Sequence, residues 1–328
     1  MIPRLRFAHL PTPIEPLPRL SAALQGPRLL VKRDDQTGLA MGGNKTRKLE
    51  FLLAEAQANG ARTLITAGAA QSNHCRQTAA AAARYGFACT LVLTLPGGAE
   101  LPLEAGTDQS GNILLDHLLG AEITWARREK REQALQETFQ AAWEAGKRPY
   151  LIPYGGSNPT GAAAYALAMQ ELIAQGARPD RIVFPSSSGG TQAGLALGAR
   201  LFGYTGKVLG ISVDELAEVL QKRVAELATA TADLLGEKLT FREEEILVNA
   251  DYLGGGYGVV GAGEKEAIAL FARHEGLLLD PVYTGRAAAG LVDLIRRGEF
   301  SADETVLFWH TGGTPALFAK AYANISGI

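Results

Sequence analysis

The chain has 328 residues, of which 47% are hydrophobic and 20% charged, with a formal net charge of −2. This composition is typical of a globular chain with one large or two ordinary domains, without a basic stripe for nucleic acid or an apolar run of about 18 residues for a membrane span. Prolines interrupt the N-terminal segment where a secretion signal needs an apolar core, so we expect a cytoplasmic protein with neither nucleic-acid nor membrane partners.

Strands and helices are predicted to alternate along the whole chain. The predicted strands cover residues 28–32, 63–68, 89–95, 121–126, 149–153, 181–185, 208–213 and 305–310. Helical runs with apolar stripes cover residues 45–59, 74–85, 131–145, 161–175 and 264–275. Repeated strand–helix–strand units predict parallel sheets covered on both faces, which is an α/β architecture. Sites in such sheets lie where strands end and helices begin, so the junctions rich in Gly, Ser, Thr and Asn are candidate sites.

The first candidate along the chain is GLAMGGNKTRKLEFLLAEA, residues 38–56. Asn44 is a residue type that caps helices well, and it predicts that Lys45 lies in the first helical turn. The positive end of the helix dipole disfavours an ammonium there and lowers the pKa of the lysine. Lys48 lies one turn later. The ordinary alternative is that both lysines face water.

A second predicted helix start lies in the sequence GAAQSNH, after the strand at residues 63–68. Its backbone N–H groups predict an anion site suited to the carboxylate of an amino acid. Ser72, Asn73 and His74 are the candidate side chains. Taken alone, Ser72 and Asn73 are helix caps more often than catalytic groups, and a histidine in a first helical turn is more often structural.

The sequence PSSSGGTQAG, residues 185–194, joins a predicted strand to an apolar helix. Free backbone N–H groups, hydroxyls and glycines at such a junction favour the binding of a phosphate. The candidate residues are Ser187, Ser188, Gly189, Gly190 and Thr191. A tight turn with hydroxyl caps is the alternative. Because the Lys-Ser/Thr ending of a P-loop is missing, nucleotide hydrolysis is not expected.

A rival interpretation comes from GYGVVG, residues 256–261, which matches the GxGxxG fingerprint of dinucleotide-binding proteins. Asp280 follows about twenty residues later, where a ribose-binding acid is expected. This pattern would indicate a NAD-dependent oxidoreductase. Polar residues and an extra glycine stand where a buried strand should precede the turn, and Pro281 directly follows Asp280, so the match is weak.

A phosphate loop without a nucleotide motif, together with a lysine behind two glycines, points to pyridoxal phosphate, whose aldehyde binds a lysine as a Schiff base. Six sequence blocks support this cofactor: KRDDQTGLAMGGNKTRKLEFL, AGAAQSNHCRQTAAAAA, SSSGGTQAGLALG, GYGVVGAG, GLLLDPVYTGRAAAGLVDLI and FWHTGGTPALFA. Together they resemble the D-cysteine desulfhydrase and 1-aminocyclopropane-1-carboxylate (ACC) deaminase family, a branch of the tryptophan-synthase-β-like, fold type II pyridoxal phosphate enzymes. The similarity runs from about Pro11 to Phe318.

The resemblance implies roles for the lysines and the amides. It makes Lys45, directly after Gly-Gly-Asn, the lysine that binds the cofactor and the simplest group for proton transfer. Lys48 and the loop of residues 187–191 are implied to hold the phosphate. Asn44 is implied to contact the cofactor, and Asn73 to bind its ring hydroxyl.

The resemblance also implies which residues meet the substrate. Ser72 is implied to be catalytic and, with Asn73 and His74, to lie near the substrate. Tyr257 and Tyr283 are implied to flank cofactor and substrate, where a phenol stacks or transfers a proton. Buried tyrosines with one hydrogen bond each are the ordinary alternative.

Two positions favour the desulfhydrase side of the family. Thr284 stands where the deaminase pattern has Glu, and Thr311 stands where it has Leu, near the pyridine nitrogen of the cofactor. We therefore expect both threonines at the substrate and α,β-elimination of D-cysteine to pyruvate, hydrogen sulfide and ammonia. ACC deamination and elimination of sulfite from cysteate stay open as alternatives. One departure is Arg286, where the family has Lys; it keeps the charge but not the compact ammonium.

The resemblance implies a two-domain homodimer that acts on a small-molecule amino acid. Residues 1–47 and 154–328 are expected to form a large cofactor-binding domain, into which a small α/β domain of residues 48–153 is inserted. No metal is expected, because Cys75 and Cys89 have no CxxC spacing and the five histidines form no HExxH motif.

Overall fold

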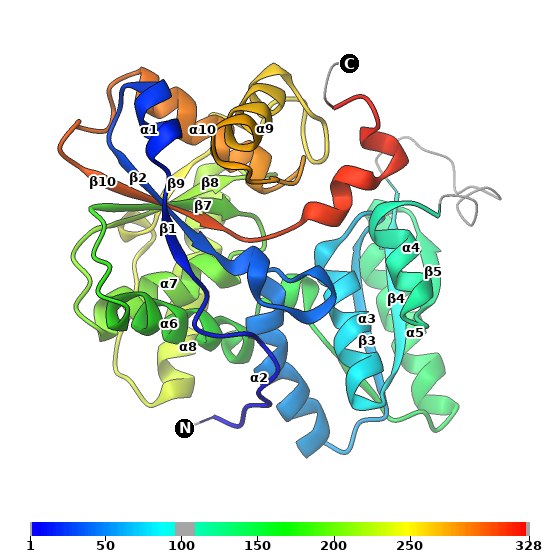
Figure 1. Cartoon of the computed structure of the whole chain (residues 1–328). Coiled ribbons are helices and arrows are strands. Elements are labelled where there is room, and N and C mark those ends of the chain that lie inside the picture. The colour runs from blue at the N-terminus through cyan, green and yellow to red at the C-terminus, as the bar shows by residue number, and fades with distance from the viewer. Residues whose placement is uncertain (1, 96–108, 326–328) are drawn as a thin grey trace.

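The computed structural model describes residues 2–95 and 109–325, and its strands form two separate sheets (Figure 1). The larger sheet has the order β1-β2-β10-β7-β8-β9, and the smaller sheet has the order β5-β4-β3-β6. The strands are β1 (Ile14–Pro16), β2 (Arg28–Arg33), β3 (Thr63–Ala69), β4 (Ala88–Thr94), β5 (Glu122–Ala126), β6 (Pro149–Leu151), β7 (Arg181–Ser186), β8 (Lys207–Ser212), β9 (Leu247–Asn249) and β10 (Thr305–His310). The smaller sheet is parallel, and β1 pairs antiparallel with β2 at the edge of the larger, otherwise parallel sheet.

Ten α-helices connect and cover the strands within the described ranges. They are α1 (Pro18–Leu24), α2 (Asn44–Ala58), α3 (Asn73–Tyr85), α4 (Gly111–Leu118), α5 (Arg131–Glu144), α6 (Pro159–Ala174), α7 (Gly190–Leu201), α8 (Ala217–Leu235), α9 (Ala262–Glu275) and α10 (Thr284–Arg296). None of the helices in residues 2–95 and 109–325 is long and apolar enough to cross a membrane. The predicted α/β class is confirmed. The edge strands β1 and β9 were not predicted, because three residues carry too little periodicity.

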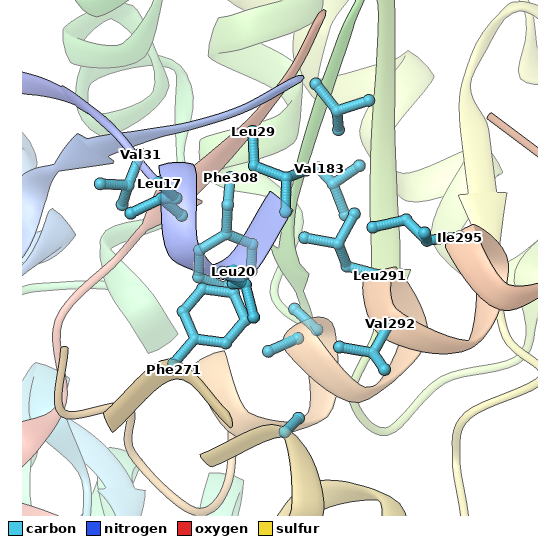
Figure 2. Close-up of a cluster of buried hydrophobic side chains, with 14 of the residues drawn as sticks. Leu17, Leu20, Leu29, Val31, Val183, Phe271, Leu291, Val292, Ile295 and Phe308 are labelled. Atoms are coloured by element: carbon cyan, nitrogen blue, oxygen red, sulfur yellow. The ribbon is translucent and has the colours of Figure 1, made fainter. Parts of the chain in front are cut away.

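Helices α1, α9 and α10 cover one face of the larger sheet, and α6, α7 and α8 cover the other (Figure 1). Figure 2 shows the core on the first face, where Leu20 of α1, Phe271 of α9 and Phe308 of β10 are fully buried. The rings of Phe271 and Phe308 lie 5.2 Å apart. Each such side chain contributes about 1.5–3 kcal/mol of burial free energy, which fixes these helices on the sheet.

The smaller sheet is also covered on both faces. Leu49 and Leu52 of α2 pack with α3 on one face, and Leu135 of α5 packs on the other. Strand β3 is therefore almost continuously buried, which explains why it contains no charged residue. The small domain of residues 48–153 stays a prediction, and its first boundary falls inside α2.

Helix α2 is attached to both sheets. While its leucines pack on the smaller sheet, buried Arg47 donates to Asp34 from Nε and Nη2, over 2.9 and 2.8 Å, and to Glu171 from Nη1, over 2.9 Å. Burial acts to raise the pKa of Asp34, but the Arg47 guanidinium outweighs burial and lowers this pKa, so the pair stays ionised. Lys45, two residues before Arg47, is thus fixed relative to both sheets.

Candidate active site

A cavity lies where β3, β7 and β10 end and α2 begins, which is the expected location for a site in parallel sheets. Its lining consists of Asn44, Lys45, Ser72, Asn73, His74, Tyr154, Gly155, residues 185–189, Thr191, Tyr283, Thr311 and Gly312. Segments predicted separately from the sequence therefore meet around one space.

The start of α2 differs from the prediction in its cap. Gly43 is the N-cap, with φ of 128°, and Asn44 is the first helical residue, so the prediction that Asn44 caps the helix is wrong. Gln77 of α3 takes over this function, because its Oε1 accepts from Thr46 N over 2.7 Å. The Asn44 side chain is engaged elsewhere, donating from Nδ2 to Thr191 Oγ1 over 3.1 Å. Lys45 still lies in the first turn, as predicted.

Lys45 has an unusually acidic ammonium. Burial lowers its pKa to about 8, because the charged form loses hydration. The pKa is lowered, as expected, but the cause is the desolvation of the buried amine and not the helix dipole. No carboxylate in the described part of the chain forms an ion pair with Lys45. A large fraction of this amine is neutral near pH 8, and the neutral amine is the form that adds to an aldehyde.

Lys48 is fully buried, so it is not a surface lysine. Its Nζ donates to Gly155 O over 3.1 Å and to Ser157 Oγ over 3.3 Å. Burial, followed by the charge of Lys45, lowers the pKa of Lys48 well below its usual value. A methyl group built on Gly190 would lie 2.9 Å from this Nζ, so the Lys48 amine adjoins the start of α7.

The start of α7 has the form predicted for an anion site. Strand β7 ends at Ser186, and Gly189, with φ of 85°, turns the chain into the helix. The first N–H groups of a helix have no acceptor within it. Ser157 Oγ lies 2.8 Å from Ser188 Oγ and accepts from Gly190 N over 3.2 Å. A methyl group on Gly190 would lie 2.5 Å from Ser157 Oγ, so only glycine leaves room here.

These residues fit a phosphate-bearing aldehyde. The cavity lining carries the Lys45 amine, hydroxyls and the starts of α2, α3 and α7, but no carboxylate among the described residues that line it. Ser186 Oγ and His74 Nδ1 also line this region, and both are buried without a hydrogen-bond partner. A donor-rich lining without an acid, in which the Ser186 hydroxyl has no partner, is suited to an anionic group.

The start of α3 is the second candidate anion site. Ser72 is its N-cap, with Oγ accepting from Cys75 N over 3.2 Å, and it also lines the cavity. The cap interpretation of Ser72 is therefore confirmed, while its role at the substrate stays a prediction. Asn73 Oδ1 accepts from Asn112 Nδ2 over 3.0 Å and from Arg76 Nη1 over 3.2 Å, which fixes the amide plane.

His74 is neutral and has a defined tautomer. Its Nε2 lies 2.9 Å from Thr66 Oγ1, which itself donates to Ile152 O over 2.8 Å. Because the Thr66 hydroxyl donates its hydrogen to Ile152 O, it accepts from His74. Nε2 therefore carries the histidine hydrogen, and Nδ1 is an acceptor. Burial, followed by the charges of Lys45 and Lys48, lowers the pKa of His74 well below its usual value.

The two predicted tyrosines are in contact. The hydroxyls of Tyr257 and Tyr283 lie 2.6 Å apart, with ring centroids 5.9 Å apart in an edge-on arrangement. Tyr283 lines the cavity, while Tyr257 lines a larger adjoining cavity of about 1350 Å³. Burial raises the pKa of both phenols well above the usual value, so both are protonated and each is able to donate.

The two threonines lie in different surroundings. Thr311 lines the cavity, and its carbonyl accepts from Asn44 N over 2.9 Å. Thr284 lies outside the cavity lining and is fully buried, with Oγ1 donating to Asp280 Oδ1 and accepting from Asp280 N, both over 2.7 Å. The geometry gives Thr284 a structural role, so its contact with substrate stays a prediction without structural support.

The dinucleotide interpretation is wrong for this fold. Turns occupy residues 251–258, so no strand runs directly into GYGVVG. The Asp280 carboxylate accepts from the N–H groups of Val282, Tyr283 and Thr284 at 2.7 to 3.0 Å. Asp280 therefore shapes the start of α10 and has no oxygen available for a ribose.

One lining segment was not predicted. Tyr154, Gly155 and Ser157 lie in YGGSNPTG, between β6 and α6. The segment is a strand-to-helix junction rich in Gly, Ser and Asn, like the candidate junctions GAAQSNH and PSSSGGTQAG. The same signal would have found it.

A buried lysine beside a donor-rich helix start points to a class of protein, the pyridoxal phosphate enzymes. The family described as "Pyridoxal-phosphate dependent enzyme" matches residues 5–312, and the chain belongs to this family. The predicted cofactor, pyridoxal phosphate, is confirmed.

Two solved structures are similar over most of the chain. A structure of an ACC deaminase homologue has 38% identity and a TM-score of 0.87, covering 97% of this chain and 94% of its own. The processed form of threonine deaminase isoform 2 from Solanum lycopersicum has 18% identity and a TM-score of 0.64, covering 92% of this chain and 79% of its own. The first supports the predicted family branch, and the second shows the shared fold type II architecture.

Proposed function

We propose that the chain is a carbon–sulfur lyase that converts D-cysteine to pyruvate, hydrogen sulfide and ammonia. The observation that carries the proposal is Thr311, a neutral hydroxyl that lines the cavity at the position implied to lie near the pyridine nitrogen. The neighbouring carboxylate of Asp280 is saturated by backbone N–H groups. A ring without an acid at its nitrogen is suited to β-elimination, where the leaving group is already good, rather than to opening a cyclopropane.

Different residues of the cavity bind different parts of the cofactor. The start of α7, with Ser187, Ser188, Gly189, Gly190 and Thr191, binds the phosphate, and the Lys48 amine lies beside it. Asn44 and Asn73 would orient the ring. Lys45 would bind the aldehyde carbon until the amine of the substrate displaces it, which leaves the Lys45 amine free as a base. When bound, pyridoxal phosphate supplies an electron-withdrawing ring that stabilises negative charge at the substrate α-carbon.

Ser72 and the free N–H groups at the start of α3 bind the substrate carboxylate. His74 Nδ1, an acceptor, is suited to an N–H of the substrate or of Lys45.

The proton transfers use Lys45 and the tyrosine pair. The α-proton passes to the neutral Nζ of Lys45, its electron pair forms the Cα–Cβ double bond, and the Cβ–S bond breaks. Tyr283, whose hydroxyl is supported by Tyr257, is placed to donate toward the departing sulfur. Water then hydrolyses the released enamine to pyruvate and ammonia.

A panel of four substrates tests this proposal: D-cysteine, L-cysteine, cysteate and ACC, assayed for sulfide, sulfite and keto acid. Sulfide and pyruvate from D-cysteine support it, with the Lys45→Ala variant as the inactive control. Consumption of ACC alone would establish the deaminase alternative, which the similarity to an ACC deaminase homologue keeps open, and sulfite from cysteate would establish the sulfo-lyase. The proposal also includes a homodimer, which rests on the family resemblance, and a cytoplasmic location.

A further inference from the structure

Arg286 is a buried cation that points away from the reacting centre. It lies in the first turn of α10, three residues after Tyr283, and is 1% exposed. Its Nε donates to Glu264 Oε1 over 2.9 Å. The remaining guanidinium nitrogens donate to backbone carbonyls of Val213, Gly256 and Val259 over 2.7, 3.0 and 2.8 Å. None of these partners lines the cavity that contains Lys45, whereas Gly256 and Val259 line the larger adjoining cavity beside Tyr257.

Two of these carbonyls flank Tyr257. The segment of residues 250–261 contains neither helix nor strand, so its carbonyls depend on other partners. Within it, Gly256 and Val259 are held by Arg286, and Gly258 O accepts from Tyr322 Oη over 3.2 Å. The backbone on both sides of Tyr257 is therefore fixed by side chains from the C-terminal part of the chain.

One helical turn controls both tyrosines. Tyr283, at the start of α10, meets the Tyr257 hydroxyl at 2.6 Å, and Arg286 of the same turn holds the Tyr257 backbone. Glu264 completes the arrangement, because its Oε1 accepts from Arg286 and its Oε2 accepts from Gly261 N over 3.0 Å. The planar guanidinium of Arg286, with five N–H donors, reaches the Glu264 carboxylate and the three backbone carbonyls at once. The single ammonium of a lysine does not reach all four acceptors.

We propose that Arg286 is a positioning residue, which sets Tyr257 against Tyr283 by holding the carbonyls of Gly256 and Val259. The proposal rests on the proposed function only in that the tyrosine pair serves the elimination. It accounts for arginine at a position where the resembling family has lysine: the guanidinium makes four hydrogen bonds that shape the loop, and the substrate is not among its partners.

Arg286→Lys is the main test, and Arg296→Lys is a matched control. Arg296 lies at the end of the same helix and pairs with Glu266 of α9 over 2.6 Å, but both side chains are about half exposed. We expect kcat for D-cysteine to fall roughly tenfold in Arg286→Lys, with KM and cofactor loading within about twofold of the parent, because small displacements of a proton donor are costly. Arg296→Lys should match the parent. Unchanged kcat in a folded, cofactor-loaded Arg286→Lys enzyme would overturn the proposal.

A double-mutant cycle with Tyr257→Phe distinguishes positioning from general structural support. If Arg286 acts through the Tyr257 hydroxyl, Arg286→Lys should lower kcat by less than about twofold in the Tyr257→Phe background. An equal loss in both backgrounds would contradict the proposal. Glu264→Gln, which keeps an oxygen acceptor but removes the charge, repeats the cycle if Arg286→Lys does not fold.

Hydrogen exchange gives a readout that does not depend on turnover. The amides of Gly256 and Val259, which donate to Leu253 O and Gly256 O, should exchange at least about tenfold faster in Arg286→Lys and unchanged in Arg296→Lys. Equal protection in the parent and Arg286→Lys would overturn the positioning role. If the parent enzyme prefers another substrate of the panel, the proposed function fails, while the exchange result still decides the role of Arg286.

Discussion

Asn44 and Thr191 are joined by a hydrogen bond across the cavity, from Nδ2 to Oγ1 over 3.1 Å. Asn44 directly precedes Lys45 at the start of α2, and Thr191 is the second residue of α7. The bond therefore connects the helix that carries the aldehyde-binding lysine to the helix that binds the phosphate. It fixes the spacing between the two ends of the cofactor site, and the predictions for the cofactor follow from this spacing.

Replacement of Gly190 by alanine should weaken cofactor binding. The added methyl group would lie 2.5 Å from Ser157 Oγ and 2.9 Å from Lys48 Nζ, in the space that the phosphate contacts need. We expect the Kd for pyridoxal phosphate to rise by roughly tenfold or more, since overpacking typically costs about 1–3 kcal/mol. Gly263→Ala is the matched control, because it is also in a first helical turn but its nearest neighbour, Ala289 Cβ, would be 3.6 Å away. Equal affinities of the two variants would refute the phosphate assignment.

Cofactor capture should depend on pH through Lys45. Because burial lowers the pKa of this amine to about 8, the neutral, reactive form dominates above pH 8 and is lost as the pH falls below it. The rate at which the apoenzyme develops the violet absorbance of the lysine-bound cofactor should therefore rise with pH, with a midpoint near 8. A midpoint near the ordinary lysine value of about 10.4 would show that Lys45 is not desolvated.

Thr284→Val should affect stability more than substrate choice. The Thr284 hydroxyl donates to Asp280 Oδ1, so removal of this hydroxyl deprives the buried Asp280 carboxylate of one hydrogen-bond donor. We expect the free energy of unfolding to fall by about 1–3 kcal/mol, with little change in the ratio of kcat/KM for D-cysteine and ACC. Thr311→Val, by contrast, should change that ratio. A selectivity change in Thr284→Val with unchanged stability would instead place Thr284 at the substrate.

Asp116 should make the stability depend on pH. It is fully buried in α4, and neither carboxylate oxygen has a hydrogen-bond partner. Burial raises its pKa to about 8, against a smaller opposing effect of Arg76. Between about pH 4 and 8, the folded state keeps a proton that the unfolded state has lost, so the free energy of unfolding falls as the pH rises through this window.

Asp116→Asn should remove this dependence, measured as the change in unfolding free energy between pH 5 and pH 9. The exposed Asp233 in α8 provides the control, because Asp233→Asn should behave like the parent. Parallel pH profiles for the parent and Asp116→Asn would contradict the assignment.

The fold was largely predictable because its strands are buried on both faces. A run of uncharged, largely buried residues such as β3, followed by a helix with an apolar stripe, is a strong local signal. The rule that sites lie beyond strand ends also selects Ser72, after β3, and Thr311, after β10. That these ends of two different sheets face one cavity is a property of the tertiary structure.

The remaining features depend on contacts between distant segments. The cap of α2 comes from Gln77 instead of Asn44, and the low pKa of Lys45 comes from burial, which no local pattern reveals. Asp280 closes a loop with Thr284 in place of binding a nucleotide, and its four hydrogen bonds appear only once the chain turns into α10.

The choice between Lys45 and Lys48 as the covalent anchor is tested most directly by borohydride reduction of the cofactor-loaded protein, followed by peptide mass mapping. Both amines are buried and have lowered pKa values, but only Lys45 lines the cavity, while Lys48 donates to Gly155 O and Ser157 Oγ. We predict a single pyridoxyl group on Lys45, absent in Lys45→Ala. A pyridoxyl group on Lys48, or its persistence in Lys45→Ala, would contradict the account.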